Sequence, residues 1–161
     1  NLATDEVTIW VTDLVSTGQV DIGFGFLSIS YTGGIIEVWQ DPSKDHDFGI
    51  SPPNATVPST FTNGSLFLGG VFNSFVLFFD TNTGSGAYEG SIAFTSGSGL
   101  TTVQGIQGDG FTFGGVLDST ASGGAVPQGY DLQVDGVIEV VVEVAVEETT
   151  WGKVKSLYHN P

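Results

Sequence analysis

The chain has 161 residues and no cysteine, and its 18 acidic residues against three lysines give a formal net charge of −15. This length is typical of one domain that buries its core without disulfides. The acidic balance excludes nucleic acid and anionic membranes as binding surfaces, because clustered Lys and Arg bind phosphate, and it favours divalent cations or a basic partner. With 24 glycines and only 13% charged residues, the composition predicts a secreted all-β protein, extracellular or at the cell surface.

The first 40 residues predict three antiparallel strands. Residues 7–15 alternate apolar and polar side chains, and residues 19–31 continue with apolar positions on both faces. Residues 32–34 (Thr-Gly-Gly) then predict a hairpin turn into a strand over residues 35–40.

Residues 41–62 lack any period and predict a long polar loop, which is either functional or disordered. Asp41, Asp45 and Asp47 supply hard oxygen ligands of the kind that Ca²⁺ prefers, and the alternative is a solvated loop whose acids pair with Lys44. The same region carries two N-x-S/T sequons, so Asn54 and Asn63 are candidate glycosylation sites in a host with that machinery.

The middle of the chain predicts five short strands, over residues 65–69, 74–80, 87–96, 101–107 and 111–117. Residues 75–79 (FVLFF) are apolar at every position, which predicts a central strand covered on both faces. The following Asp80-Thr81-Asn82-Thr83-Gly84 is hairpin-turn chemistry. Asp80 and Asn82 also stand at the alternate spacing that opens a calcium loop, although no Glu follows at the twelfth position.

The end of the chain predicts a long amphipathic strand and a short helix. A strand over 130–134 leads into residues 138–146, where alternate positions are apolar and Glu139 and Glu143 lie on the other face. Within residues 149–161 four apolar side chains recur at helical spacing. These two sets are the candidate assembly anchors: Ile138, Val140, Val142, Val144 and Val146 in the strand, and Trp151, Val154, Leu157 and Tyr158 in the tail. The alternative is that the strand completes the chain's own sheet and the helix caps it. We expect a β-domain over residues 1–148 and a helical tail over 149–161.

Residues 149–158 read T-T-W-G-K-V-K-S-L-Y. They resemble the T-T-W-G-x-[IV]-K-x-L-[YF] endings of uncharacterised secreted proteins of environmental bacteria. The match covers about ten residues, and three further residues follow it here. The resemblance implies export and surface retention or assembly, and it carries no assigned activity.

Taken together, the strand pattern predicts an all-β fold: an antiparallel sandwich or jelly roll of eight to ten strands with a short C-terminal helix. Nucleophilic catalysis finds no support, since the sequence has no Cys and no G-x-S-x-G. Two carboxylates suffice for a glycosidase, and Glu37 and Glu89 are the acids best embedded among strand aromatics. Trp10, Trp39 and Tyr31 are candidates for a sugar-stacking platform, and core packing is the alternative.

Three functional hypotheses follow. The leading one is a secreted structural or surface-assembly subunit that associates with copies of itself or another surface protein, through strand addition and docking of the tail. The second is a carbohydrate-binding module or adhesin supported by Ca²⁺. The third is a small glycosidase. The first two are not enzymes, and none of the three requires a cofactor other than Ca²⁺.

Overall fold

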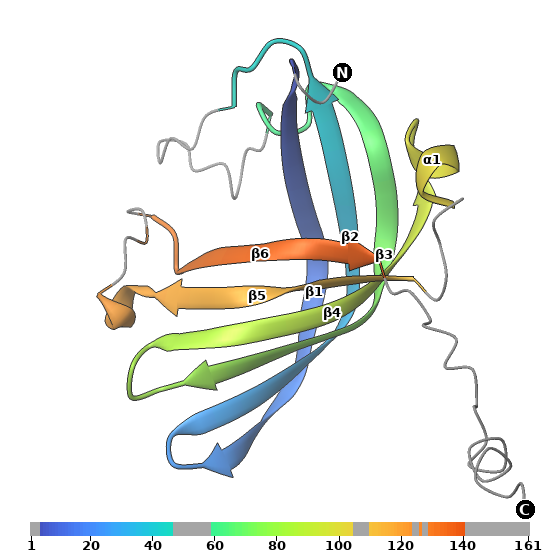
Figure 1. Cartoon of the computed structure of the whole chain (residues 1–161). Coiled ribbons are helices and arrows are strands. Elements are labelled where there is room, and N and C mark those ends of the chain that lie inside the picture. The colour runs from blue at the N-terminus through green and yellow to red at the C-terminus, as the bar shows by residue number, and fades with distance from the viewer. Residues whose placement is uncertain (1–3, 47–58, 105–109, 124–125, 127–128, 141–161) are drawn as a thin grey trace, which may run out of the picture.

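The computed structural model describes residues 4–46, 59–104, 110–123, 126 and 129–140. They form one antiparallel sheet of six strands, in which each strand pairs with the next in the chain (Figure 1). The strands are β1 (Glu6–Gly23), β2 (Phe26–Asp41), β3 (Ser65–Asp80), β4 (Ser85–Ser96), β5 (Phe111–Ser119) and β6 (Leu132–Val140). A short helix α1 (Leu100–Gln104) and a 3-10 turn η1 (Thr120–Ser122) flank β5.

The first two strands are long because each continues through a bend. Asp13 of β1 has φ 59°, and opposite it Gly33 and Gly34 of β2 have φ 71° and 99°. A Cβ on Gly33 would lie 2.8 Å from the carbonyl oxygen of Asp13, so glycine is required there. The expected turn at residues 32–34 was therefore wrong: its glycines bend β2, and the hairpin turn lies at Phe24 and Gly25.

The bend changes which residues of each strand face inward. In β2 the odd residue Tyr31, before the bend, packs inward, whereas the even residues Ile36 and Val38 are the buried ones after it. In β3 the register shifts between Phe72 and Ser74, and the inward positions change from Phe72 to Phe75. An extra residue in a strand bends it and raises its twist. The sheet accordingly curls, and Figure 1 shows β6 crossing β1 on its concave side.

Two clusters of buried side chains fill the concave face. The larger packs β2, β3 and β4 against Phe111 of β5, through residues 36–38, 68–72 and 92–94. The smaller lies on the other side of the bend and contains Leu77, Tyr88 and Leu117. Aromatic rings join the two, since Phe75 contacts both Phe72 and Tyr88 with ring centroids 5.4 and 5.8 Å apart. Among the described residues, the convex face exposes large apolar side chains, which include Val71, Phe78 and Val116.

The all-β antiparallel class is confirmed, and one curled sheet supplies facing layers as the two halves of a sandwich do. The expected eight to ten strands were too many for the described residues, because strands predicted separately on either side of a bend are continuous. The strand expected over residues 101–107 was also wrong, since α1 occupies its start. Residues 75–79 lie in the central β3, but one face is open and Phe78 is 42% exposed.

The amphipathic closing strand is present as far as Val140. Ile138 and Val140 pair with Phe113 and Phe111 and pack against the larger cluster, while Glu139 is exposed. The rest of the predicted strand and the tail over 149–161 lie outside the described residues, as does the boundary expected at residue 148. Within the described part of the chain, no helix is long and apolar enough to cross a membrane.

Candidate functional site

The outer edge of β1 is the longest strand edge in the described structure. β1 has 18 residues, pairs with β2 alone among the strands that the structure describes, and contains no Lys, Arg or Pro. Edge strands are usually protected by such residues, because their free N–H and C=O groups pair with other chains. Five aliphatic side chains of this strand are 42% to 63% exposed: Val7, Ile9, Val15, Val20 and Ile22. β1 is therefore an open template for a further strand.

The opposite edge of the sheet belongs to β6, which pairs with β5 of its own chain. Two of the predicted assembly anchors, Ile138 and Val140, are consequently part of the chain's own core. For these two residues the structure shows the alternative, in which the strand completes the chain's own sheet, and a role in assembly stays a prediction. The remaining anchors lie outside the described residues: Val142, Val144, Val146, Trp151, Val154, Leu157 and Tyr158.

Two of the three predicted platform aromatics come together on the convex face. Thr8 pairs with Trp39 and Trp10 pairs with Glu37, so Trp10 and Trp39 are diagonal neighbours across β1 and β2. Both indoles are half-buried, and Trp39 Nε1 donates a hydrogen bond of 3.2 Å to Glu37 Oε2. Thr8 Oγ1 donates to the Phe61 carbonyl at 2.6 Å, which brings the 59–62 segment beside this pair.

Tyr31, the third aromatic of that set, does not join them. It lies on the other side of the bend, on the concave face, where its ring meets Phe75 edge-on at 5.6 Å. The register with both neighbouring strands is kept through Gly33 and Gly34, and their positive φ reverses the side on which odd residues of β2 point. The platform is therefore a pair of tryptophans and a carboxylate, rather than three aromatic rings.

The two candidate glycosidase carboxylates stand far apart. Glu37 is paired with Gly69 of β3 and Glu89 with Val76, seven residues further along the same strand. At about 3.3 Å per residue this is roughly 20 Å. Glycosidase carboxylates are about 5 to 9.5 Å apart. Glu89 instead lines a shallow hollow of the convex face with Thr112 and Glu139.

The acidic side chains near the long loop are used to hold its ends. Asp41 Oδ1 accepts the Ser43 backbone N–H at 2.7 Å, and the Asp45 carboxylate accepts Asn63 Nδ2 at 3.1 and 3.3 Å. Asn63 is exposed. Asp47 and Asn54 lie outside the described residues. In the part of the chain that the structure describes, no three His, Cys, Asp or Glu side chains gather as a metal site would require. Calcium binding stays a prediction.

The Asp80–Gly84 segment is the β3–β4 hairpin turn, as its composition predicted. Asp80 Oδ1 accepts the backbone N–H and the side-chain amide of Asn82, both at 2.9 Å, and Oδ2 accepts Thr83 Oγ1 at 3.0 Å. These bonds, led by the Asn82 N–H, hold the pKa of Asp80 below its ordinary value. Asn82 Nδ2 also donates to the Phe24 carbonyl at 2.9 Å. The turn thus fastens the β1–β2 hairpin tip to the β3–β4 tip.

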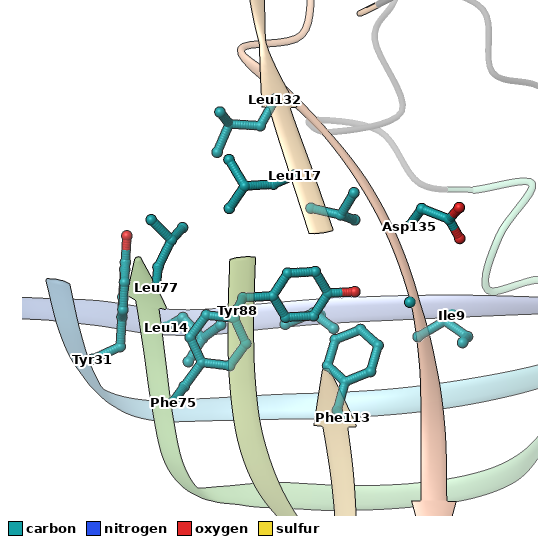
Figure 2. A pocket seen from close by; sticks show the side chains of 13 residues that line it. Ile9, Leu14, Tyr31, Phe75, Leu77, Tyr88, Phe113, Leu117, Leu132 and Asp135 are labelled. Atoms are coloured by element: carbon teal, nitrogen blue, oxygen red, sulfur yellow. The ribbon is translucent and has the colours of Figure 1, made fainter. Parts of the chain in front are cut away.

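A cavity of about 560 Å³ opens on the concave face, between the two edges of the curled sheet (Figure 2). Its walls come from opposite ends of the sheet, with Ile9, Val11 and Leu14 of β1 on one side and residues 132–136 of β6 on the other. Its floor is made of side chains from the central strands: Tyr31, Phe75, Leu77, Tyr88, Phe113 and Leu117.

Tyr88 crosses the floor of this cavity toward β6. Tyr88, Gly115 and Gly136 are register partners in one row across β4, β5 and β6. The two glycines leave space for the ring, which is 5% exposed. The hydroxyl is buried and finds no hydrogen-bond partner among the described residues. Burial, with a smaller contribution from the Asp135 carboxylate, raises the pKa of this phenol.

Sequence reasoning missed the cavity, since its walls are more than 100 residues apart in the chain. The only local signal is the set of glycines that pair with aromatics, such as Gly90 opposite Phe75. Comparisons with protein-family models, curated proteins and solved structures find no match to this chain. Function is therefore inferred from three features of its own geometry: the β1 edge, the tryptophan pair and the cavity.

Proposed function

We propose that this protein is an exported structural or surface-assembly subunit that associates by strand addition along the free edge of β1. The observation that carries the proposal is a strand edge of 18 residues that has five exposed aliphatic side chains and no Lys, Arg or Pro. Strand addition supplies main-chain hydrogen bonds to such an edge, and the alternate side chains determine which partner fits. Lysine and proline, which commonly protect such edges, are absent from β1, and its charges are Glu6, Asp13 and Asp21.

The two edges of the sheet differ, which sets the kind of assembly. One edge is β1 and the other is β6. Joining β1 of one copy to β6 of the next is a head-to-tail contact, and head-to-tail contacts generate filaments when the rotation does not close a ring. Tail docking is the second proposed contact, because Lys153 and Lys155 of the 149–161 segment complement an acidic body.

Lysine on the β1 edge tests this assembly. Val20→Lys places a charge on the edge strand at a side chain that is 63% exposed. Val116→Lys is the matched control, because it adds the same charge at a side chain that is 58% exposed in the interior strand β5. We expect the native chain and Val116→Lys to form species well above 16.8 kDa by light scattering, and Val20→Lys to remain monomeric. A native chain that stays at 16.8 kDa at every concentration would refute the proposal.

Carbohydrate binding is the second candidate function, because Trp10 and Trp39 lie side by side with a carboxylate on an open face. Aromatic rings of this kind present an apolar face with a polar edge to a ligand. The bond from Trp39 Nε1 to Glu37 fixes the indole and leaves the second carboxylate oxygen to accept sugar hydroxyls.

The test of carbohydrate binding is glycan-array binding of Trp39→Ala. The control is Phe78→Ala, which removes a 42% exposed ring of β3 that lies on the same convex face of the sheet as Trp39. Loss of binding in Trp39→Ala alone supports the platform. Equal binding by both variants, or no binding by the native chain with and without Ca²⁺, excludes it.

A further inference from the structure

We propose that the concave cavity between β1 and β6 binds an uncharged, largely apolar small molecule. This inference is independent of the assembly proposed above, since it concerns the inside of the curled sheet and not its β1 edge. A volume of about 560 Å³ lies inside the range of roughly 300 to 1,000 Å³ that small-molecule sites occupy. The lining is aliphatic and aromatic apart from two tyrosine hydroxyls and Asp135.

The floor of the cavity is preformed by aromatic packing. The ring of Phe75 stacks on Tyr88 with centroids 5.8 Å apart, and Tyr88 meets Phe113 at 5.1 Å. The ring of Tyr31 packs edge-on against Phe75 from the β2 side. Rings held on both sides lose little further freedom when a ligand docks, and this preorganisation favours binding.

The mouth of the cavity exposes apolar side chains that the fold leaves uncovered. Ile9 and Leu132 are each 42% exposed and Val134 is 57% exposed, although all three line the cavity. They lie on the two strands that face each other across it, as Figure 2 shows for Ile9 and Leu132. A bound apolar molecule would remove these surfaces from water, which is the main favourable contribution to binding in such sites.

The charges around the cavity select against ions. The lining contains no Lys or Arg to pair with an anion, and the formal net charge of −15 repels one. Asp135 is paired with Val116 in the register, and Figure 2 shows its carboxylate pointing away from the Tyr88 ring. A cation inside would lose its hydration against a lining that is apolar apart from Asp135 and two tyrosine hydroxyls, which is costly. An uncharged ligand meets neither penalty.

A matched pair of fluorescent probes tests both the binding site and its expected preference for an uncharged ligand. N-Phenyl-1-naphthylamine is uncharged and apolar, and 8-anilino-1-naphthalenesulfonate adds a sulfonate to the same skeleton. We expect the uncharged probe to bind the full chain at one site per molecule, at least tenfold more tightly than the sulfonate at low salt. The titration is made at concentrations where sedimentation velocity shows a 16.8 kDa monomer.

Two tryptophan substitutions on β6 locate the probe. Val134→Trp fills the mouth from inside, since Val134 pairs with Leu117 and lines the cavity. Val137→Trp is the control, because Val137 is 58% exposed and lines the hollow on the opposite face. We expect binding to fall at least tenfold in Val134→Trp and to persist in Val137→Trp.

Three results would overturn the proposal. The first is a monomer without a saturable probe site, and the second is an equal affinity of Val134→Trp and the native chain. The third is probe binding that appears only as the mass rises above 16.8 kDa, which would place the probe between copies of the chain. Val20→Lys separates this outcome from the assembly proposal, since a monomeric Val20→Lys variant must still bind the probe.

Discussion

The hydroxyl of Tyr88 on β4 lies over Gly136 of β6, two strands away, and a Cβ at Gly136 would stand 2.2 Å from that oxygen. The same Cβ would lie 2.4 Å from the carbonyl oxygen of Gly114. The last strand can therefore join the sheet at this point only through a residue without a side chain.

Substitution of Gly136 by alanine should destabilise the fold by about 2 kcal/mol, because overpacking of this kind costs roughly 1–3 kcal/mol. Thermal unfolding followed by circular dichroism measures this as a fall in Tm. Gly114→Ala is the control, since its Cβ would be 3.3 Å from the nearest atom, the Tyr88 carbonyl oxygen. Equal losses in both variants would show that the contact with Tyr88 is not responsible.

Removing the Tyr88 hydroxyl should stabilise the protein or leave its stability unchanged. The oxygen is buried without a partner among the described residues, and an unsatisfied buried polar group costs about 1–3 kcal/mol. We expect Tyr88→Phe to raise the free energy of unfolding by about 1 kcal/mol in urea at pH 7. If Tyr88→Phe instead lowers the free energy of unfolding by more than about 1 kcal/mol, the hydroxyl makes a stabilising hydrogen bond, and the prediction is wrong.

The loss of stability at alkaline pH should also depend on Tyr88. The pKa of Tyr88 is raised in the folded protein above its ordinary value of 10.0, so the unfolded chain loses this proton first. The stability that the protonated Tyr88 phenol contributes is therefore fully present below pH 10.0 and is lost as pH rises through the pKa of the folded protein. Urea unfolding should be measured from neutral pH to above the folded pKa of Tyr88. Over this range the free energy of unfolding should fall less for Tyr88→Phe than for the native chain. Parallel declines would refute this assignment.

The loss of stability at acidic pH should depend on the Asp80–Gly84 turn, which joins the two hairpin tips. The pKa of Asp80 is held below its ordinary value of 3.8 by bonds from Asn82 and Thr83. The carboxylate thus stabilises the fold above pH 3.8, and this contribution is lost as pH falls through the lower folded pKa. Asp80→Ala should lower Tm at pH 7, with a difference that shrinks on acidification.

Asp131→Ala is the control for that experiment, because it removes the same charge from an exposed position outside the turn. It should leave Tm at pH 7 nearly unchanged. If both variants lower Tm by the same amount at every pH, the effect of Asp80 comes from net charge rather than from the turn.

Assembly through the β1 edge should increase with ionic strength. Copies with a formal charge of −15 repel each other, and this repulsion is screened within about 10 Å at 0.1 M salt. Light scattering of the native chain at about 0.01 and 0.15 M NaCl should show larger species at the higher salt. CaCl₂ at matched ionic strength tests for a specific effect of Ca²⁺. Smaller species at high salt would mean that attraction between charges, not strand addition, holds the copies together.

Local sequence patterns determined the class of this fold and several of its parts. Alternation of apolar and polar residues marks the start of the first strand and the end of the last one, because successive side chains of a strand point to opposite faces. It also placed Ile138 and Val140 on the buried face of the last strand. The Asp80–Gly84 turn was readable because its side chains bond to their own backbone. These features depend on residues a few positions apart.

Only the tertiary structure decided how the strands bend and which distant residues meet. Positive φ at Asp13, Gly33 and Gly34 turns a supposed hairpin into a bend of two long strands, and it sends Tyr31 to the face opposite Trp39. Pairing across the sheet brings Trp10 beside Trp39, while curling sets β1 opposite β6 around the cavity. Positive-φ residues at a bend reverse all later alternation, and the register between strands is fixed by packing over the whole sheet. For that physical reason the candidate binding surfaces emerge only when the chain is folded.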